Sequence, residues 1–519
     1  MSATMSSMTL ARDSLQAHEP SAGWSTWLVR QGYQRLLVLR AQIDLYYFWE
    51  KRWFFFVLGF GALMLSLAPP HGLSQEGWVM LIMSGAATVL FITHPVPLPT
   101  VALLIIVGQV LLVGVDSDIV AGNLMTDSVL FIMGSLMLAV AVVKQKLDKR
   151  IAWSIVRITG TRTVNVCFGI SAVCGLMASF IGEHTVAAMM LPVGITLISL
   201  TAQNPARIRN LSAFILFSIV FGCTTAGIGT PSGGARNAIM IGYWQEFFYN
   251  PANPATRRYV IDYLTWMLYG YPLFIAQLLF VTPILYFTFR PERQDLSRAV
   301  AKLRLQIELD GPMTPGAWLS VFIFILIMIG WITASQLIGM GTVALLGTCA
   351  FLVTGLVKWE DINSGVNWGV VLLYAAAISL GVEMQTTGAA SWLADQVFAL
   401  FAPIGLGSGL GLLAGVAILT AAVANTMAPG AAVAVLGPIV LKLAGPTGAD
   451  PIQIGFITAF ASAFAYLAVA SSPASTIVFS SGYLKISDFL RVGWRMALMS
   501  MILLLLQAEF LWPLIDHWR

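Results

Sequence analysis

The stretch Phe180–Pro192, FIGEHTVAAMMLP, places a glutamate and a histidine side by side within apolar sequence. Ionisable side chains are expensive in lipid, and those that occur there commonly serve substrates or ions. Glu183 and His184 therefore predict a functional site inside a membrane. The alternative is a satisfied structural Glu–His pair without a role in function.

The composition identifies the class of protein in which such a site would lie. The chain has 519 residues, of which 58% are hydrophobic and 10% are charged, whereas soluble proteins keep roughly a quarter of their residues charged. These proportions predict an all-α polytopic membrane protein. The net charge of +4 is too small and too dispersed to suggest a nucleic-acid partner.

The apolar segments predict about 11 transmembrane helices, plus two re-entrant hairpins where Gly, Pro and polar residues interrupt the apolar sequence. We expect a cytoplasmic tail with an interfacial helix over residues 1–52 and a cytoplasmic linker over 291–314. A first repeat with a leading span is expected over 53–290, and a second repeat over 315–519.

Basic residues in the loops predict the orientation. Lys and Arg cluster after the fourth predicted span and again over residues 290–304, whereas the loop around Asp116 has none. Cytoplasmic loops are enriched in Lys and Arg, so we expect the N-terminus in the cytoplasm and the C-terminus outside. The expected location is a bacterial inner (plasma) membrane.

An internal repeat relates the two halves. The pentapeptide TVALL occurs at Thr100–Leu104 and again 242 residues later, at Thr342–Leu346. The same offset aligns Glu183 with Asn425, and Gly229-Thr230-Pro231 with Ser471-Ser472-Pro473. The predicted topologies of the copies are opposite, and inverted repeats are typical of secondary transporters with a site at the repeat interface.

Each copy contains a hairpin tip followed by a break within a helix. The predicted hairpins lie at about 164–184 and 403–426, and the breaks at about 227–237 and 470–482. A broken helix exposes N–H groups that favour an anion and C=O groups that favour a small cation. The four interruptions therefore predict adjacent anion and cation sites.

These segments resemble the divalent anion/sodium symporter family of dicarboxylate, citrate and sulfate carriers. The resemblance runs from about residue 50 to the C-terminus, and its most specific match is SSGYLKISDFLRVGW, Ser480–Trp494. It implies inverted repeats, a scaffold domain that forms a homodimer, and a transport domain that moves as an elevator in the lipid bilayer. It also implies coupling to Na⁺, at one site or two, without an organic cofactor.

The resemblance also implies site residues. The family carries Ser-Asn-Thr at each hairpin tip, and this chain has Ala424-Asn425-Thr426 at the second. At the first tip the motif falls on Gly182-Glu183-His184 or on Glu183-His184-Thr185, and Ser179 matches an upstream serine in the second register. The expected substrate-binding residues are Glu183, His184, Thr185, Thr230, Arg236, Asn237, Asn425, Thr426, Ser472, Pro473 and Ser475. The expected sodium-site residues are Ser179, Gly182, Glu183, Gly229, Thr420, Val423, Asn425 and Ser471.

The first half departs from the family pattern by two charges. Glu183 stands in the tip, and Arg236 stands in a break where the family has a Gly-Thr-Pro-Pro-Asn-like run. We hypothesise that the two side chains pair in place of the first sodium ion, because an unpaired charge at that depth would cost several kcal/mol. Alternatives are protonation of Glu183 or His184 in place of sodium binding, or contact of Arg236 or His184 with an additional anionic group.

The predicted function is secondary active transport of small divalent organic anions resembling C4-dicarboxylates. Alternatives are a sodium-independent exchanger, a proton-coupled carrier, and a carrier of sulfate or tricarboxylates. An intramembrane enzyme is a remote alternative, because the chain has no HExxH motif and GEHT offers no nucleophile. We therefore expect a transporter and not an enzyme.

Overall fold

The computed structural model describes residues 45–145, 160–202, 204–301 and 313–518. The predicted tail, most of the predicted interfacial helix and residues 302–312 of the predicted linker lie outside these ranges. The chain forms two units, Met1–Phe56 and Val57–Arg519. The described part of the first contains α3 (Leu45–Glu50) and the start of α4 (Arg52–Leu65).

The described residues are helical and contain no named strand, which confirms the predicted all-α class. The first half of the larger unit continues with α5 (Gln75–Thr93), α6 (Leu98–Gly108) with a π-helical turn Gln109–Val113, α7 (Ser117–Asn123), α8 (Asp127–Lys144), α10 (Thr163–Ile181), α11 (Glu183–Thr201), α12 (Arg209–Ala226), α13 (Ala235–Phe248) and α14 (Tyr263–Thr288).

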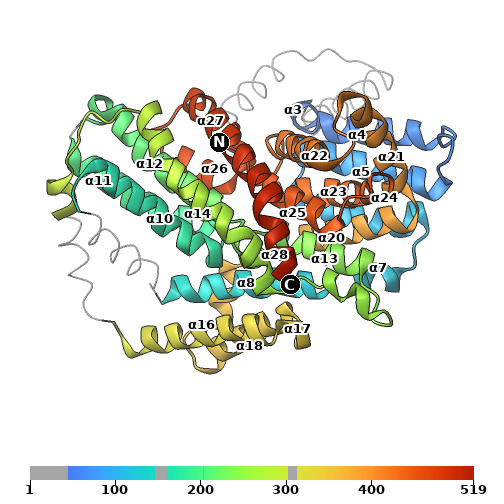
Figure 1. Cartoon of the computed structure of the whole chain (residues 1–519), viewed down its shortest axis with the longest axis horizontal. Coiled ribbons are helices and arrows are strands. Elements are labelled where there is room, and N and C mark those ends of the chain that lie inside the picture. Colours follow the sequence, from blue (N-terminus) through green and yellow to red (C-terminus); the bar gives the residue numbers. More distant parts are fainter. Residues whose placement is uncertain (1–44, 146–159, 203, 302–312, 519) are drawn as a thin grey trace, which may run out of the picture. The chain divides into compact units, whose positions relative to one another are not determined.

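The second half begins after the predicted linker (Figure 1). It comprises α16 (Pro315–Thr333), α17 (Ser335–Ile338), α18 (Met340–Val353), α19 (Trp359–Gly365), α20 (Trp368–Thr386), α21 (Ala389–Phe401), α22 (Gly409–Ala424), α23 (Pro429–Lys442), α24 (Ala444–Thr447), α25 (Pro451–Ala461), α26 (Pro473–Phe479), α27 (Ile486–Leu506) and α28 (Trp512–Trp518).

Ten of the described helices are long and apolar enough to cross a membrane, or 11 if the pair α21 and α22, bent by 120°, is one span. Two of the ten, α10 and α11, are the arms of a hairpin. Its second arm extends to Thr201, so the predicted range 164–184 covers only the first arm and the turn. The second hairpin likewise continues beyond Thr426, through α23.

The two halves share their order of helices. Shifted by 242 residues, α7 coincides with α19, and the first residues of α6 and α12 coincide with those of α18 and α25. Contacts between the two halves also occur in matching pairs. The contact of α6 with α20 has its counterpart in the contact of α18 with α8. The contact of α11 with α26 has its counterpart in the contact of α23 with α13. This pairing is the pattern of two halves related by an approximate two-fold axis.

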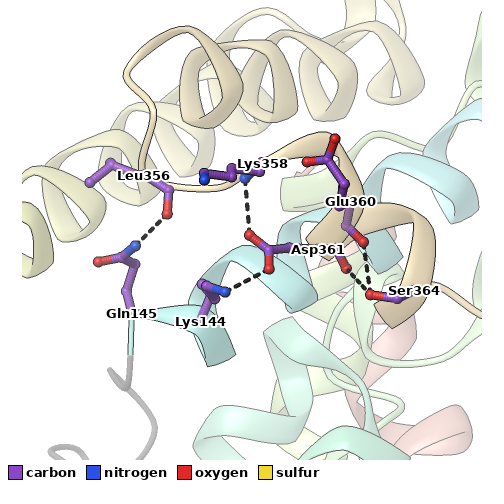
Figure 2. A network of polar contacts seen from close by, with 7 residues as sticks. All are labelled: Lys144, Gln145, Leu356, Lys358, Glu360, Asp361 and Ser364. Carbon is purple, nitrogen blue, oxygen red and sulfur yellow. Dashed lines mark hydrogen bonds and ion pairs between the residues drawn. The ribbon is translucent and has the colours of Figure 1, made fainter.

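A polar network joins the halves at the end of α8 (Figure 2). Lys144 Nζ donates to Asp361 Oδ1 at 2.6 Å, and the Lys358 N–H donates to Asp361 Oδ2 at 3.1 Å. Beside them, the Gln145 side chain donates to the Leu356 carbonyl. The Lys144 ammonium group, aided by the Lys358 N–H, holds the pKa of Asp361 below its ordinary value.

Asp361→Asn is expected to lower the melting temperature of the purified protein at neutral pH, by about 1–2 °C. Because folding lowers the pKa of Asp361, the pair stabilises the protein above the unfolded carboxyl pKa of about 4. That contribution is lost as the pH falls through the lower pKa of the folded state. Thermal unfolding across a pH series should show a difference between wild type and variant that shrinks below about pH 4.

Glu360→Gln is the matched control, because the Glu360 carboxylate has no ion-pair partner within the described ranges. It removes the same charge from the same short helix and should leave the melting temperature unchanged. An equal effect of the two substitutions, or an effect of Asp361→Asn that is independent of pH, would contradict a specific pair with Lys144.

Candidate functional site

The first hairpin turns at a single glycine. Gly182 has φ +89° and ψ 145°, a conformation essentially restricted to glycine. This turn ends α10 at Ile181 and begins α11 at Glu183. The Glu183 carboxylate therefore lies in the first turn of a helix, where the helix dipole favours a negative charge.

Side chains of the protein cap the carbonyls that the first helix break releases. Between α12 and α13, the Asn237 amide donates to the carbonyls of Gly227 and Thr230, both at 2.7 Å. The Trp266 indole donates to the Ile228 carbonyl at 2.8 Å. The Thr230 hydroxyl donates to the Ser179 carbonyl on α10 and so ties the break to the hairpin.

Glu183 and Arg236 form a buried ion pair. Arg236 Nη1 lies 3.6 Å from Glu183 Oε1, and the two residues are 3% and 7% exposed. The pairing that the sequence suggested is therefore present in the structure. Its geometry is incomplete, because Arg236 Nε and Nη2 have no hydrogen-bond partner in the structure.

Two glycines leave room for the guanidinium group. A Cβ atom at Gly227 would collide with Arg236 Nη2, and one at Gly234 would lie 2.8 Å from Nη1. The glycines of GIGTPSGG therefore make room for a charged side chain inside the break.

The second half has the corresponding turn and break with different chemistry. Asn425 donates to the carbonyls of Ala421 and Phe464 and accepts from the Leu467 N–H, so it joins the second tip to the second break. The Ser471 hydroxyl donates to the carbonyls of Ala465 and Ala468. Apart from this network, the hydroxyl oxygens of Thr420 and Ser472 are buried and have no hydrogen-bond partner in the structure.

A pocket of about 240 Å³ lies where tips and breaks of both halves meet. Its lining includes five of the predicted site residues: Gly182, Glu183, His184, Arg236 and Pro473. It also includes Ala428, Pro429 and Gly430 from the turn after Asn425. The pocket is therefore built by both repeats.

The other predicted site residues do not line this pocket. Asn237 and Asn425 hold the breaks together, and Thr426 is exposed, with its hydroxyl on the Val423 carbonyl. Buried without lining the pocket are Ser179, Gly229, Thr230, Thr420, Ser471, Ser472 and Ser475. Thr185 and Val423 are half-buried.

Four polar residues that line the pocket, Ser135, Ser232, Asn367 and Tyr374, are absent from the predicted site residues. Ser135 belongs to α8, Tyr374 belongs to α20, and Asn367 caps the N-terminus of α20. The Ser135 hydroxyl has no hydrogen-bond partner in the structure. For Ser135 and Tyr374, the available signal was the presence of hydroxyl side chains in two aligned apolar runs, VLFIMGSLMLAV and VLLYAAAISLGV.

The site offers oxygen atoms for a cation and no cluster typical of a transition metal. Within the described ranges, no three His, Cys, Asp or Glu residues group so as to hold a metal ion. Hard cations such as sodium bind instead to carbonyl and hydroxyl oxygens. Thr420 and Ser472 fit that chemistry, because their buried hydroxyl oxygens have no partner among the described residues.

Gly227→Ala is expected to displace Arg236 and weaken its pair with Glu183. Gly227 has φ −60°, which alanine adopts without strain, so the main effect is the collision of the added Cβ with the guanidinium group, beside a tighter contact of 3.2 Å with the Gly233 carbonyl oxygen. Overpacking of this kind costs about 1–3 kcal/mol. The melting temperature of the purified variant should fall, whereas Gly85→Ala, with nothing within 4 Å of the added Cβ, should not lower it, because alanine is favoured over glycine inside a helix. Equal stability of the two variants would contradict the tight fit of Arg236.

Comparison with known proteins agrees with this architecture. The family described as "Sodium:sulfate symporter transmembrane region" matches residues 49–518. A "Sodium-dependent dicarboxylate transporter SdcS" of Staphylococcus saprophyticus is 24% identical, covering 87% of this chain and 89% of the relative. An "Uncharacterized transporter" of Haemophilus influenzae is 27% identical, covering 80% of this chain and 86% of the relative.

Two solved structures share the fold. Neisseria gonorrhoeae MtrF has a TM-score of 0.55 at 10% identity, over 87% of this chain and 96% of that protein. The Alcanivorax borkumensis YdaH transporter has a TM-score of 0.53 at 13% identity, over 76% and 88%. Together with the family match across the repeats, the breaks and the pocket, these likenesses identify an integral membrane transporter and not an enzyme. The chain belongs to the sodium:sulfate symporter family, which comprises the divalent anion/sodium symporters that its sequence resembles.

Proposed function

We propose that the protein is a secondary active carrier of small divalent organic anions resembling C4-dicarboxylates. The observation that carries this proposal is the convergence of the N-termini of α11, α13 and α23 on the pocket. Glu183 and His184 begin α11, Ala235 and Arg236 begin α13, and Pro429 and Gly430 begin α23. Free N–H groups and the positive ends of helix dipoles favour an anion there.

Neutral donors and the Arg236 charge complete the anion site. Ser135 and Tyr374 offer hydroxyl groups, and Asn367 offers an amide, on the side of the pocket formed by α8 and the start of α20. Such groups suit the oxygens of a carboxylate. The Staphylococcus relatives, named as sodium-dependent dicarboxylate transporters, support the same class of substrate. The pocket of about 240 Å³ suits a small organic anion.

The proposed coupling ion is sodium, bound in the second half only. In the first half, Arg236 and Glu183 supply a fixed ion pair, and the Thr230 hydroxyl is used by the Ser179 carbonyl. Shifted by 242 residues, Thr230 corresponds to Ser472, whose hydroxyl oxygen is unpartnered. The hydroxyl of Thr420, which is also buried without a partner among the described residues, corresponds to Ala178, which has no hydroxyl.

We further propose the arrangement that the family resemblance implies. The protein is a homodimer in a bacterial inner membrane, with its N-terminus in the cytoplasm and its C-terminus outside. One set of helices forms the scaffold, and the hairpins with the broken helices move across the membrane as an elevator. The pocket supports this division, because α8 and α20 line one part of it and the tips and breaks line the rest.

Uptake of labelled succinate, citrate and sulfate into proteoliposomes tests substrate and coupling together. Each solute is offered with a sodium gradient, a proton gradient, or unlabelled solute inside. We expect succinate uptake driven by sodium, with a Hill coefficient near 1 for sodium because one site remains. A coefficient near 2 would contradict the loss of the first sodium site. Uptake that responds only to internal substrate would favour an exchanger.

The ion pair is tested by removing its charges singly and together. Glu183→Gln and Arg236→Gln each leave an uncompensated buried charge, so each should lower succinate uptake roughly tenfold or more. The double variant restores neutrality and should recover part of that loss. Glu246→Gln is the control, because Glu246 is exposed on α13 and does not line the pocket. Strictly additive losses in the double variant would refute the pair as a unit of the transport site.

A further inference from the structure

A second concavity, unrelated to the transport pocket, lies between α10 and α14. It has a volume of about 650 Å³ and is lined mainly by apolar side chains, among them Val164, Phe168, Leu279 and Phe287. It shares no lining residue with the pocket that contains Glu183 and Arg236. We refer to this concavity as the α10–α14 groove.

The α10–α14 groove is open at the outer surface of two membrane-spanning helices. Leu279 is 58% exposed and Phe287 is 71% exposed, and both belong to α14, one of the ten candidate spans. Apolar side chains exposed on a spanning helix face the acyl chains of the bilayer. The groove is therefore a recess for a lipid chain and not a compartment for a water-soluble solute.

Arginine residues surround one end of the groove. Its lining begins at Val164, two residues after Arg162, and ends at Phe287, three residues before Arg290. The two chain segments lie side by side, because the Thr163 N–H donates to the Gln294 carbonyl at 2.9 Å and the Leu296 N–H donates to the Thr161 carbonyl at 2.9 Å. The backbone therefore gathers four exposed arginines at this end: Arg162, Arg290, Arg293 and Arg298.

These arginines are available to an external anion. None of the four forms an ion pair with another residue that the structure describes. The nearby carboxylates have other partners, since Glu292 accepts from the backbone N–H groups of Asn210 and Leu211, and Asp295 accepts from Ser297. The end of the groove is therefore positively charged.

The groove also contains a polar atom without a partner. The Thr282 hydroxyl belongs to a lining residue that is 3% exposed and has no hydrogen-bond partner in the structure. A buried hydroxyl without a partner carries a desolvation penalty that a ligand oxygen could remove. Asn165 lines the same groove in the first turn of α10.

We propose that the α10–α14 groove binds an acidic glycerophospholipid. An acyl chain lies along Phe168, Leu279 and Phe287, an ester oxygen accepts from Thr282, and the phosphate lies among Arg162 and the arginines that follow α14. Basic pockets between membrane helices bind acidic lipid headgroups in this way. The site is independent of the proposed transport chemistry and would be present in a protein that carried any solute.

Native mass spectrometry of the purified full chain tests the charged end of the site. The protein is titrated with phosphatidylglycerol or with phosphatidylcholine of identical acyl chains. Each arginine near a membrane surface contributes about 1 kcal/mol to binding of acidic lipid, or roughly fivefold. Arg162→Ala combined with Arg290→Ala should therefore weaken phosphatidylglycerol binding roughly 25-fold and leave phosphatidylcholine binding unchanged.

Arg257→Ala is the matched control, because Arg257 is also exposed but precedes α14 instead of following it. It should bind phosphatidylglycerol as the wild type does. An equal loss in this control, or an undiminished preference for phosphatidylglycerol in the double variant, would overturn the proposal. All three substitutions change exposed side chains, and the melting temperatures of the double variant and the control in lipid-free detergent verify that both are folded.

A second pair of measurements separates a lipid site from a simple phosphate site. Leu279→Trp fills the groove without changing its charge and should weaken phosphatidylglycerol binding severalfold. Glycerol phosphate, which carries the headgroup charge without acyl chains, should fail to displace the bound lipid. Displacement by glycerol phosphate, or unchanged lipid binding by Leu279→Trp, would reduce the site to surface charge and refute the groove as a lipid site.

Discussion

The structure depends on one constraint, which is that backbone N–H and C=O groups within a membrane must find partners inside the protein. Both halves interrupt a helix, so both release carbonyls that need donors. In the first half Asn237 and Trp266 provide them, and in the second Asn425 and Ser471 provide them. These polar side chains stabilise the breaks. The N-terminus of α13, which follows the first break, lies at the pocket with those of α11 and α23, which follow the hairpin tips.

Within this shared framework the halves differ in charge. The first half places Glu183 and Arg236 at the pocket, in a space that two glycines leave free. In the described part of the second half, the buried hydroxyl oxygens of Thr420 and Ser472 have no hydrogen-bond partner. The tip and break of the first half therefore contain a fixed ion pair, whereas those of the second half contain neutral oxygens. An inverted duplication allows such different roles, because the corresponding segments of both halves meet at one site.

Much of the fold and part of the site could be predicted from sequence. The TVALL repeat predicted the two related halves, and the opposite charges of Glu183 and Arg236 predicted their pairing, because an unpaired charge is costly at that depth. Ser135 and Tyr374 could not be predicted, because a hydroxyl in an apolar run does not reveal which face of its helix meets the pocket. Thr426 was assigned to the substrate, although its hydroxyl bonds to the Val423 carbonyl and its side chain is exposed.

By itself the sequence determined the membrane class, the duplication and the positions of the four interruptions, since these follow from composition and from local residue chemistry. Only the tertiary structure decided which polar groups cap the backbone and which face the pocket. Asn237, Asn425, Glu183 and Arg236 all stand at interruptions. The two asparagines form hydrogen bonds with backbone groups, whereas Glu183 and Arg236 line the pocket. The physical reason is that hydrogen-bond satisfaction depends on contacts between segments far apart in the chain, which local sequence does not specify.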